Sequence, residues 1–128
     1  MIEQFQPVSV PMPGGPYSAG IKVGNLLFLA GQGPFDEKGE RVGETFADQV
    51  RATFDNLERV ANAAGTSLTN AARIGAYLSS LDYFGEFNRV MAEYVSEPYP
   101  ARTTIPVKLR GFDVEIDAVV FVPEADEG

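Results

Sequence analysis

The feature that most constrains the fold is a strand-like run near the C-terminal end of the chain, residues 113–122. Successive side chains of a strand point to opposite faces of a sheet, so alternate positions share a face. One set of alternate positions is wholly apolar, and the other changes from acidic to apolar along the run. The first set is Val114, Ile116, Ala118, Val120 and Val122, and the second is Glu115, Asp117, Val119 and Phe121. This pattern predicts a strand that is covered on both faces over its second half.

A second strand-like run, residues 102–109, precedes it, and a short turn around Gly111 separates the two. Short turns that contain glycine join antiparallel neighbours, so we expect the two runs to pair in the sheet. This pairing would place Arg102 and Glu115 on neighbouring backbones. Pro106 lacks a backbone N–H and favours a bulge or a sheet edge at its position.

Two further segments have apolar residues at three- and four-residue steps, which predicts amphipathic helices at 45–64 and 83–96. Thr45 is the expected N-cap of the first helix and Gly65 its C′ residue, and Asp82 is the expected N-cap of the second. The remaining predicted strands are a short edge strand at 3–8, a hairpin of 17–23 with 26–30, and 72–78. Two helices cover one face of a sheet, so we expect another copy of the chain to cover the other face.

The composition is that of a folded domain with a limited set of chemistries. A chain of 128 residues that is 45% hydrophobic suits a single domain, residues 1–128. The net charge of −8 disfavours a protein that binds a phosphate backbone. Because the chain has no Cys and no His, it cannot form disulfides, thiolate sites or nucleophile systems that need an imidazole base.

The N-terminal residues lack the basic and apolar segments of a signal peptide, and no apolar run is long enough to span a membrane. We therefore expect a cytoplasmic protein that has no contact with membranes or nucleic acids.

Four features are candidates for binding or chemistry, and each also has a purely structural interpretation. Arg102 can clamp a carboxylate, or it can form a surface ion pair with one of the 18 acidic residues. Glu115 can handle a proton, or it can be an outward charge on a half-exposed strand. Tyr17 can offer its phenol or simply pack. Gly31 and its neighbours can present backbone N–H groups to an anion, although glycine turns are common.

Taken together, several short motifs resemble those of one family. They are Gly15-Pro16-Tyr17-Ser18, Gly31-Gln32 after an apolar strand, Asn56 and Asn88 on the two helices, Pro100-Ala101-Arg102-Thr103, and Val114-Glu115-Ile116-Asp117-Ala118. In order and spacing over nearly the whole chain, they are similar to those of the RidA (YjgF) family of enamine/imine deaminases.

The resemblance implies an α+β fold of the chorismate-mutase-like type, with a mixed sheet, two helices on one face and three subunits packed into a central barrel. It implies hydrolysis of imino acids such as 2-iminopropionate, which derives from 2-aminoacrylate, to a keto acid and ammonia, without metal or organic cofactor. By position, Arg102 would hold the substrate carboxylate with the Gly31 N–H, and Glu115 would orient water or move a proton. Tyr17, from an adjacent subunit, and Asn88 would line the cleft.

The chain also departs from the family pattern. Thr104 stands where many members have Cys, so a thiol nucleophile is unnecessary or absent here. If this position contributes through its backbone carbonyl, Thr can serve equally well. Ala30 replaces a frequent Ser. Two other classes of function stay open at this point. One is a trimer that binds metabolites or acts like a chaperone without turnover. The other is an RNA-cleaving or translation-inhibiting protein, which the negative charge and the absence of His oppose.

Overall fold

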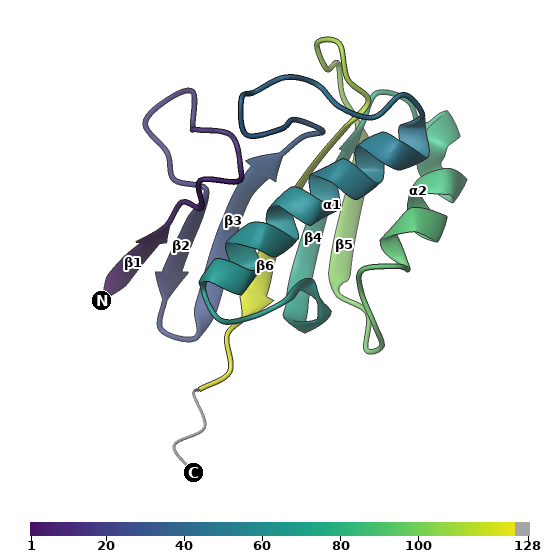
Figure 1. The fold of residues 1–128 in the computed structure, drawn as a ribbon. Coiled ribbons are helices and arrows are strands. Elements are labelled where there is room, and N and C mark those ends of the chain that lie inside the picture. Colours follow the sequence, from purple (N-terminus) through teal and green to yellow (C-terminus); the bar gives the residue numbers. More distant parts are fainter. Residues whose placement is uncertain (125–128) are drawn as a thin grey trace.

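The computed structural model describes residues 1–124 as a six-stranded mixed sheet with two α-helices on one face (Figure 1). The strands are β1 (Ile2–Phe5), β2 (Gly20–Val23), β3 (Leu26–Gln32), β4 (Ala71–Leu78), β5 (Ala101–Pro106) and β6 (Val114–Phe121). The helices are α1 (Phe46–Ala63) and α2 (Phe84–Met91), and short 3₁₀ turns lie at Leu68–Asn70 and Leu81–Tyr83. The predicted α+β class is confirmed. Within residues 1–124, no helix has the length and apolar character needed to cross a membrane.

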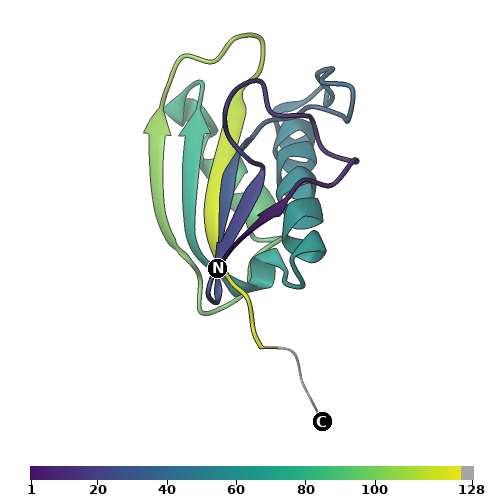
Figure 2. The same ribbon diagram turned by 90° about the vertical axis from the view of Figure 1, so that its left-hand side faces the viewer.

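The order of the strands corrects one expectation. The sheet runs β1-β2-β3-β6-β4-β5, so β5 and β6 are not neighbours as the turn between them suggested. β4 lies between them, parallel to β5 and antiparallel to β6. Figure 2 shows the connecting loop, residues 107–113, arching over the end of β4. Strand neighbours lie about 4.8 Å apart, so this loop spans about 10 Å, which a tight hairpin turn cannot do.

The N-terminal hairpin forms as predicted, with β2 and β3 antiparallel around Gly24, whose φ of 61° suits glycine. Pro106 is the last residue of β5, which lies at the edge of the sheet, so the expected edge position is confirmed.

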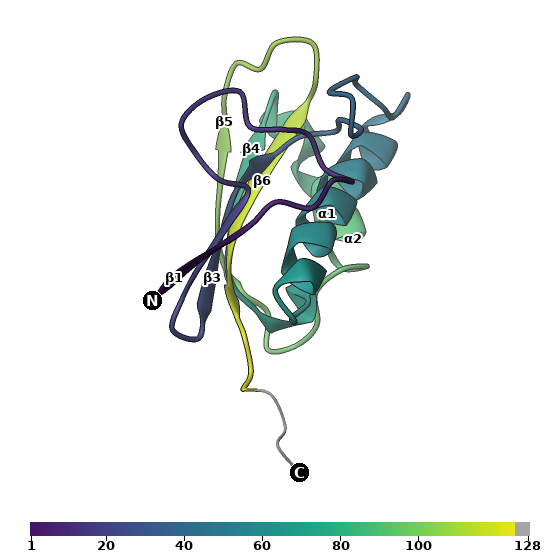
Figure 3. The ribbon, with the colours of Figure 1, turned by 60° about the vertical axis from the view of Figure 1, so that its left-hand side comes forward.

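The core lies between the helices and one face of the sheet. Figure 3 shows both helices on that side of the sheet. From the sheet, the apolar set of β6 and the residues Ile74, Ala76 and Leu78 of β4 are buried there. From α1, Val50, Phe54 and Leu57 fill the same space. Each of the Val, Leu, Ile and Phe side chains among them contributes roughly 1.5–3 kcal/mol by leaving water.

Apolar residues gather on the opposite, uncovered sheet face. In the single chain, Phe28 is 46% exposed and Phe121 is 42% exposed, and both belong to the alternate set that points away from the helices. We call this surface the open face of the sheet. Its other exposed large apolar residues are Ile2, Val23, Leu26 and Ile105.

The ends of the helices follow the expected signals only in part. Thr45 caps α1 by accepting the Asp48 N–H at 3.1 Å, and Gly65 follows with a φ of 82°. The second helix is shorter than predicted, because after Met91 the chain tightens into bonds such as Tyr94 N–H to the Met91 carbonyl. At its start, Ser80 and not Asp82 accepts the capping bond, and it caps the preceding 3₁₀ turn.

Candidate active site

Arg102 lies in an apolar groove between β5 and α2. Its guanidinium carbon is 5.2 Å from the ring centre of Phe84 and 5.4 Å from that of Phe87, and its Nη1 is 3.5 Å from Met91 Sδ. No ion pair among residues 1–124 includes it. Burial lowers the pKa of Arg102, although an arginine remains charged at any physiological pH. The surface ion pair considered from the sequence is therefore wrong within the described chain, and the cation is available to an anion.

The groove beside Arg102 is large enough for a small molecule, with a volume of about 350 Å³. Asn88 supplies an amide to it from α2, and the other lining residues are mainly apolar, namely Met91, Ala92, Val95, Tyr99 and Pro100. Phe84 is one of the apolar residues in the predicted helical segment 83–96, but it is 44% exposed. It lies against the Arg102 guanidinium, and the buried residues of α2 are Phe87, Val90 and Met91.

Thr104 is on the same strand as Arg102 and on the same face, since its register partner is the buried Ala76. Its hydroxyl oxygen is buried and has no hydrogen-bond partner among residues 1–124. The side chain of Thr104 therefore points toward the helices.

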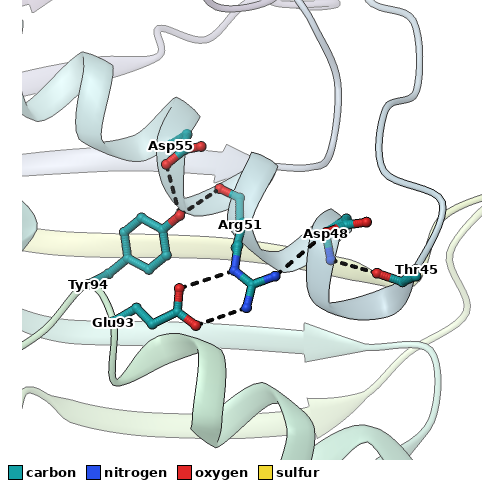
Figure 4. Close-up of polar contacts among 6 residues, drawn as sticks. All are labelled: Thr45, Asp48, Arg51, Asp55, Glu93 and Tyr94. Carbon is teal, nitrogen blue, oxygen red and sulfur yellow. Dashed lines mark hydrogen bonds and ion pairs between the residues drawn. The ribbon is translucent and has the colours of Figure 1, made fainter.

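A polar network on the outer surface fixes the segment that borders this groove (Figure 4). Arg51 on α1 binds Glu93 with two parallel bonds, of 3.1 and 3.0 Å. The hydrogen bond with Arg51 holds the pKa of Glu93 below its usual value. The Tyr94 hydroxyl donates to Asp55 at 2.9 Å, and burial followed by this bond raises the pKa of Tyr94. The turn after α2, which carries Ala92 and Val95, is thus tied to α1.

Glu115 lies on the open face, next to an irregularity in the pairing of β3 with β6. The pairing of β3 with β6 shifts between Leu29 and Gln32, so the partner of Leu29 is Ala118 and that of Gln32 is Ile116. This bulge brings Gly31 against the Glu115 carboxylate, where a Cβ would lie 2.8 Å from Oε2. A larger residue at position 31 would require the Glu115 carboxylate to move from this position.

Tyr17 and Gly31 belong to the same hollow as Glu115, a space of about 190 Å³ that Phe35 and Phe112 also line. Tyr17 is 57% exposed, and its hydroxyl accepts the Gly14 N–H at 3.2 Å. Burial is the main cause that raises the pKa of Glu115, and the charge of Asp117 adds to it.

Two buried amides hold the loops around this hollow. Asn56 of α1 is 1% exposed and donates to the carbonyls of Gly33 and Phe35, at 3.2 and 2.8 Å. Gln49 accepts the backbone N–H of Asp113 at 2.9 Å, at the start of β6. Helix α1 therefore fixes the backbone on both sides of Glu115.

The structure separates the predicted site residues into two groups. Arg102, Asn88 and Thr104 are on the helix side of the sheet, because Arg102 is level with the buried Ile74. Glu115 is level with Tyr77, three residues further along β4, and faces the other side. Strand geometry places the two Cα atoms about 14 Å apart, since they differ by two strands and three residues. Within one chain they cannot both contact one small substrate.

The sequence placed Asp117 on the same strand face as Glu115, but it did not show that Tyr77 lies beside both acids. The Tyr77 hydroxyl donates to Asp117 at 2.9 Å. Strand alternation does place both residues on outward faces, but only the register between β4 and β6 shows that they meet.

Known proteins match this chain over nearly its full length. The family described as "Endoribonuclease L-PSP" matches residues 8–122. A RutC family protein of Pyrococcus horikoshii is 41% identical over 116 residues, which are 88% of this chain and 92% of that protein. A protein of Dermatophagoides farinae named 2-iminobutanoate/2-iminopropanoate deaminase is 31% identical over 115 residues, 88% of this chain and 90% of its own.

Among solved structures, RidA from the Antarctic bacterium Psychrobacter sp. superposes with a TM-score of 0.86 at 33% identity, covering 94% of this chain and 99% of that one. The fold and the sequence together define a small α+β domain of the RidA type. The chain belongs to the endoribonuclease L-PSP family, which is also called the YjgF/RidA/RutC family. The family includes at least one protein named as an imine deaminase.

Proposed function

We propose that this protein is an enamine/imine deaminase that hydrolyses small imino acids of the 2-iminopropionate type, in clefts between the subunits of a homotrimer. The observation that carries the proposal is Arg102, a charged side chain that lies against two aromatic rings of α2 without an acidic partner among residues 1–124. A guanidinium in such surroundings binds a planar carboxylate through two parallel bonds.

Glu115 supplies the second part of the chemistry. It is a half-buried carboxyl group with a raised pKa, and no side chain of the described residues donates to it. Such a group can take a proton from water while the water oxygen adds to the imine carbon. The imine nitrogen takes up a proton to give an amino alcohol, its amino group then takes up a second proton, the C–N bond breaks, and ammonia leaves. The hydroxyl loses its proton to give the keto acid, so imine and water become keto acid and ammonia.

The separation of the two groups is the argument for a site between subunits. Arg102 comes from the edge strand β5, whereas Glu115, Gly31 and Tyr17 lie around the open face. The apolar residues of this face, such as Phe28 and Phe121, are a surface that a second copy of the chain would cover. In the proposed trimer, Arg102 and Asn88 of one subunit complete the hollow that holds Glu115 of the next.

As part of the same proposal, the enzyme works in the cytoplasm and needs neither a cofactor nor a nucleic-acid partner. Positioning of an already electrophilic carbon provides a large share of the rate enhancement. A backbone carbonyl at position 104 remains a proposed contact, whereas the Thr104 side chain is not required.

A subunit-mixing experiment tests the site directly. The variants Arg102→Ala and Glu115→Gln are each expected to be inactive when assembled alone. When the two are unfolded and refolded together in equal amounts, about a quarter of the sites receive an intact arginine from one subunit and an intact acid from the next. Imines generated from amino acids by an amino-acid oxidase provide the substrate, and the release of keto acid and ammonia is measured.

Recovery of about a quarter of the wild-type activity is the expected result. No recovery from mixtures that form mixed trimers, together with active wild-type protein, would place both residues in one subunit's site. Wild-type protein that binds 2-keto acids but hydrolyses no imine would identify the non-catalytic binding function instead. Light scattering that shows a monomer at micromolar concentration would contradict the trimer.

A further inference from the structure

Two carboxylates lie side by side on the open face, and each occupies a space that a glycine leaves free. Gly31 on β3 makes room for Glu115, as described above. Gly75 on β4 makes room for Asp117, because a Cβ at position 75 would overlap Asp117 Oδ1. Glu115 and Asp117 are two residues apart on β6 and share its outward face. Two glycines thus leave space for two adjacent carboxylates on a sheet face whose other residues are mainly apolar.

Tyr77 gives the two carboxylates different hydrogen bonding, because it donates to Asp117 and not to Glu115. In the register of β4 with β6, the residue directly opposite Tyr77 is Glu115, and the one opposite Gly75 is Asp117. The Tyr77 hydroxyl nevertheless reaches diagonally to Asp117 Oδ2 at 2.9 Å. A tyrosine hydroxyl has one proton to donate, so its bond to Asp117 leaves Glu115 without a donor.

Within residues 1–124, few charged and titratable groups surround Glu115, and in the proposed trimer the Arg102 cation of the next subunit would join them. β6 contributes Asp117, and β4 contributes Tyr77 and Arg73. The Arg73 guanidinium donates to Thr103 at 3.3 Å, away from Glu115. The loop before β2 contributes Tyr17, and β3 presents only glycine and apolar residues to this face. The nearest full charge that opposes ionisation of Glu115 is thus that of Asp117.

We propose that Asp117, held in place by Tyr77, is a positioning residue whose negative charge makes Glu115 the carboxyl group that takes up and releases the proton. The role of Glu115 in turnover rests on the proposed function, whereas the pairing with Asp117 stands on the geometry. Two carboxyl groups in unequal surroundings commonly divide the tasks of proton carrier and fixed charge.

The direction of the electrostatic effect follows from the surroundings. Burial raises the pKa of Glu115, and the charge of Asp117 raises it further, because both disfavour the ionised form. Hydrogen bonding to Asp117 is the main cause that raises the pKa of Tyr77, so the phenol keeps its proton and remains a donor. Removing the charge of Asp117 should therefore lower the pH at which Glu115 ionises.

The test is a titration of the side-chain carboxyl carbons by NMR in the full chain labelled at glutamate. The Glu115 signal is assigned by its absence from the spectrum of Glu115→Gln. In Asp117→Asn, which keeps an oxygen that can accept the Tyr77 hydroxyl, the Glu115 midpoint is expected to move to lower pH. The inflection of kcat/KM that belongs to Glu115 should move in the same direction, while kcat at the optimum changes far less than in Glu115→Gln.

Two further variants separate the charge from other effects. Glu44→Gln removes one negative charge from an exposed residue just before α1 and should leave the Glu115 midpoint in place. Tyr77→Phe removes the anchor but keeps the charge, so it should displace the midpoint less than Asp117→Asn does.

An unchanged Glu115 midpoint in Asp117→Asn would overturn the proposal, and so would an equal displacement in Glu44→Gln or in Tyr77→Phe. If the wild-type protein hydrolyses no imine, but the Glu115 midpoint moves to lower pH in Asp117→Asn, the proposed function is refuted and the pairing is supported. If the wild-type protein hydrolyses imines normally, but the Glu115 midpoint does not move in Asp117→Asn, only the pairing is refuted.

Discussion

Replacing Arg102 with lysine isolates the geometry of the proposed carboxylate clamp from its charge. The guanidinium lies 5.2 and 5.4 Å from the centres of two aromatic rings, an arrangement that fixes the plane of its donors. Lysine keeps the cation but offers only a point charge and loses one of two parallel bonds. One charge-assisted hydrogen bond is worth roughly 1.5–3 kcal/mol, so we expect kcat/KM to fall on the order of ten- to a hundredfold.

The same change should hardly affect folding. Arg102 has no ion-pair partner among residues 1–124, so its replacement breaks no salt bridge, and the lysine stem still packs along the groove. We expect the unfolding free energy to change by about 1 kcal/mol or less, the size of a weak cation–π contact.

The assay measures release of keto acid above the uncatalysed rate from imines generated in situ, together with a thermal unfolding curve. The matched control is Arg89→Lys, on the same helix that borders the groove but exposed and away from its lining. Full turnover by Arg102→Lys would refute the clamp. A variant that loses its fold would assign Arg102 to structure.

Three further changes are directed at individual atoms. Glu115→Gln keeps the shape but carries no proton, so kcat should fall on the order of 10²–10⁴-fold in steady-state assays while the thermal transition stays nearly unchanged. Gly31→Ala adds a Cβ at 2.8 Å from Glu115 Oε2, so turnover should fall although Glu115 is intact; wild-type kinetics would show that the carboxylate moves freely. Thr104→Val removes a buried hydroxyl that has no partner among residues 1–124. The unfolding free energy measured in denaturant melts should therefore rise by about 1 kcal/mol. A decrease would reveal a bond made by a neighbouring subunit.

Local periodicity in the sequence predicted most of the secondary structure. The alternation along β6 agrees with its burial at every position from Val114 to Val120, and the helical stripe of α1 with Thr45 and Gly65 marks that helix to within a residue. These features depend on neighbours within a few positions, which the sequence displays directly. The family resemblance, which covers nearly the whole chain, agrees with the matched relatives and fold.

The strand order was mispredicted because it depends on contacts between distant segments. Gly111 indicates a turn but not how far the chain travels through it, so the insertion of β4 between β5 and β6 was not visible. The same error placed Arg102 and Glu115 on neighbouring strands. Their actual positions, on opposite faces and three register steps apart, follow from the pairing of β4 with both of its neighbours. The roles of Tyr77 and Asp117 were hidden for the same reason.

The central place of β6 also determines when the chain can fold. β6 is the last strand in the sequence, yet it alone joins the β1-β2-β3 half of the sheet to the β4-β5 half. Before residues 114–121 have been synthesised, the two halves of the sheet have no shared strand, and the apolar side chains of α1 lack the strand on which much of their packing depends. The sheet is therefore completed late, by long-range pairing, and loss of this strand would divide it into two parts with exposed edges.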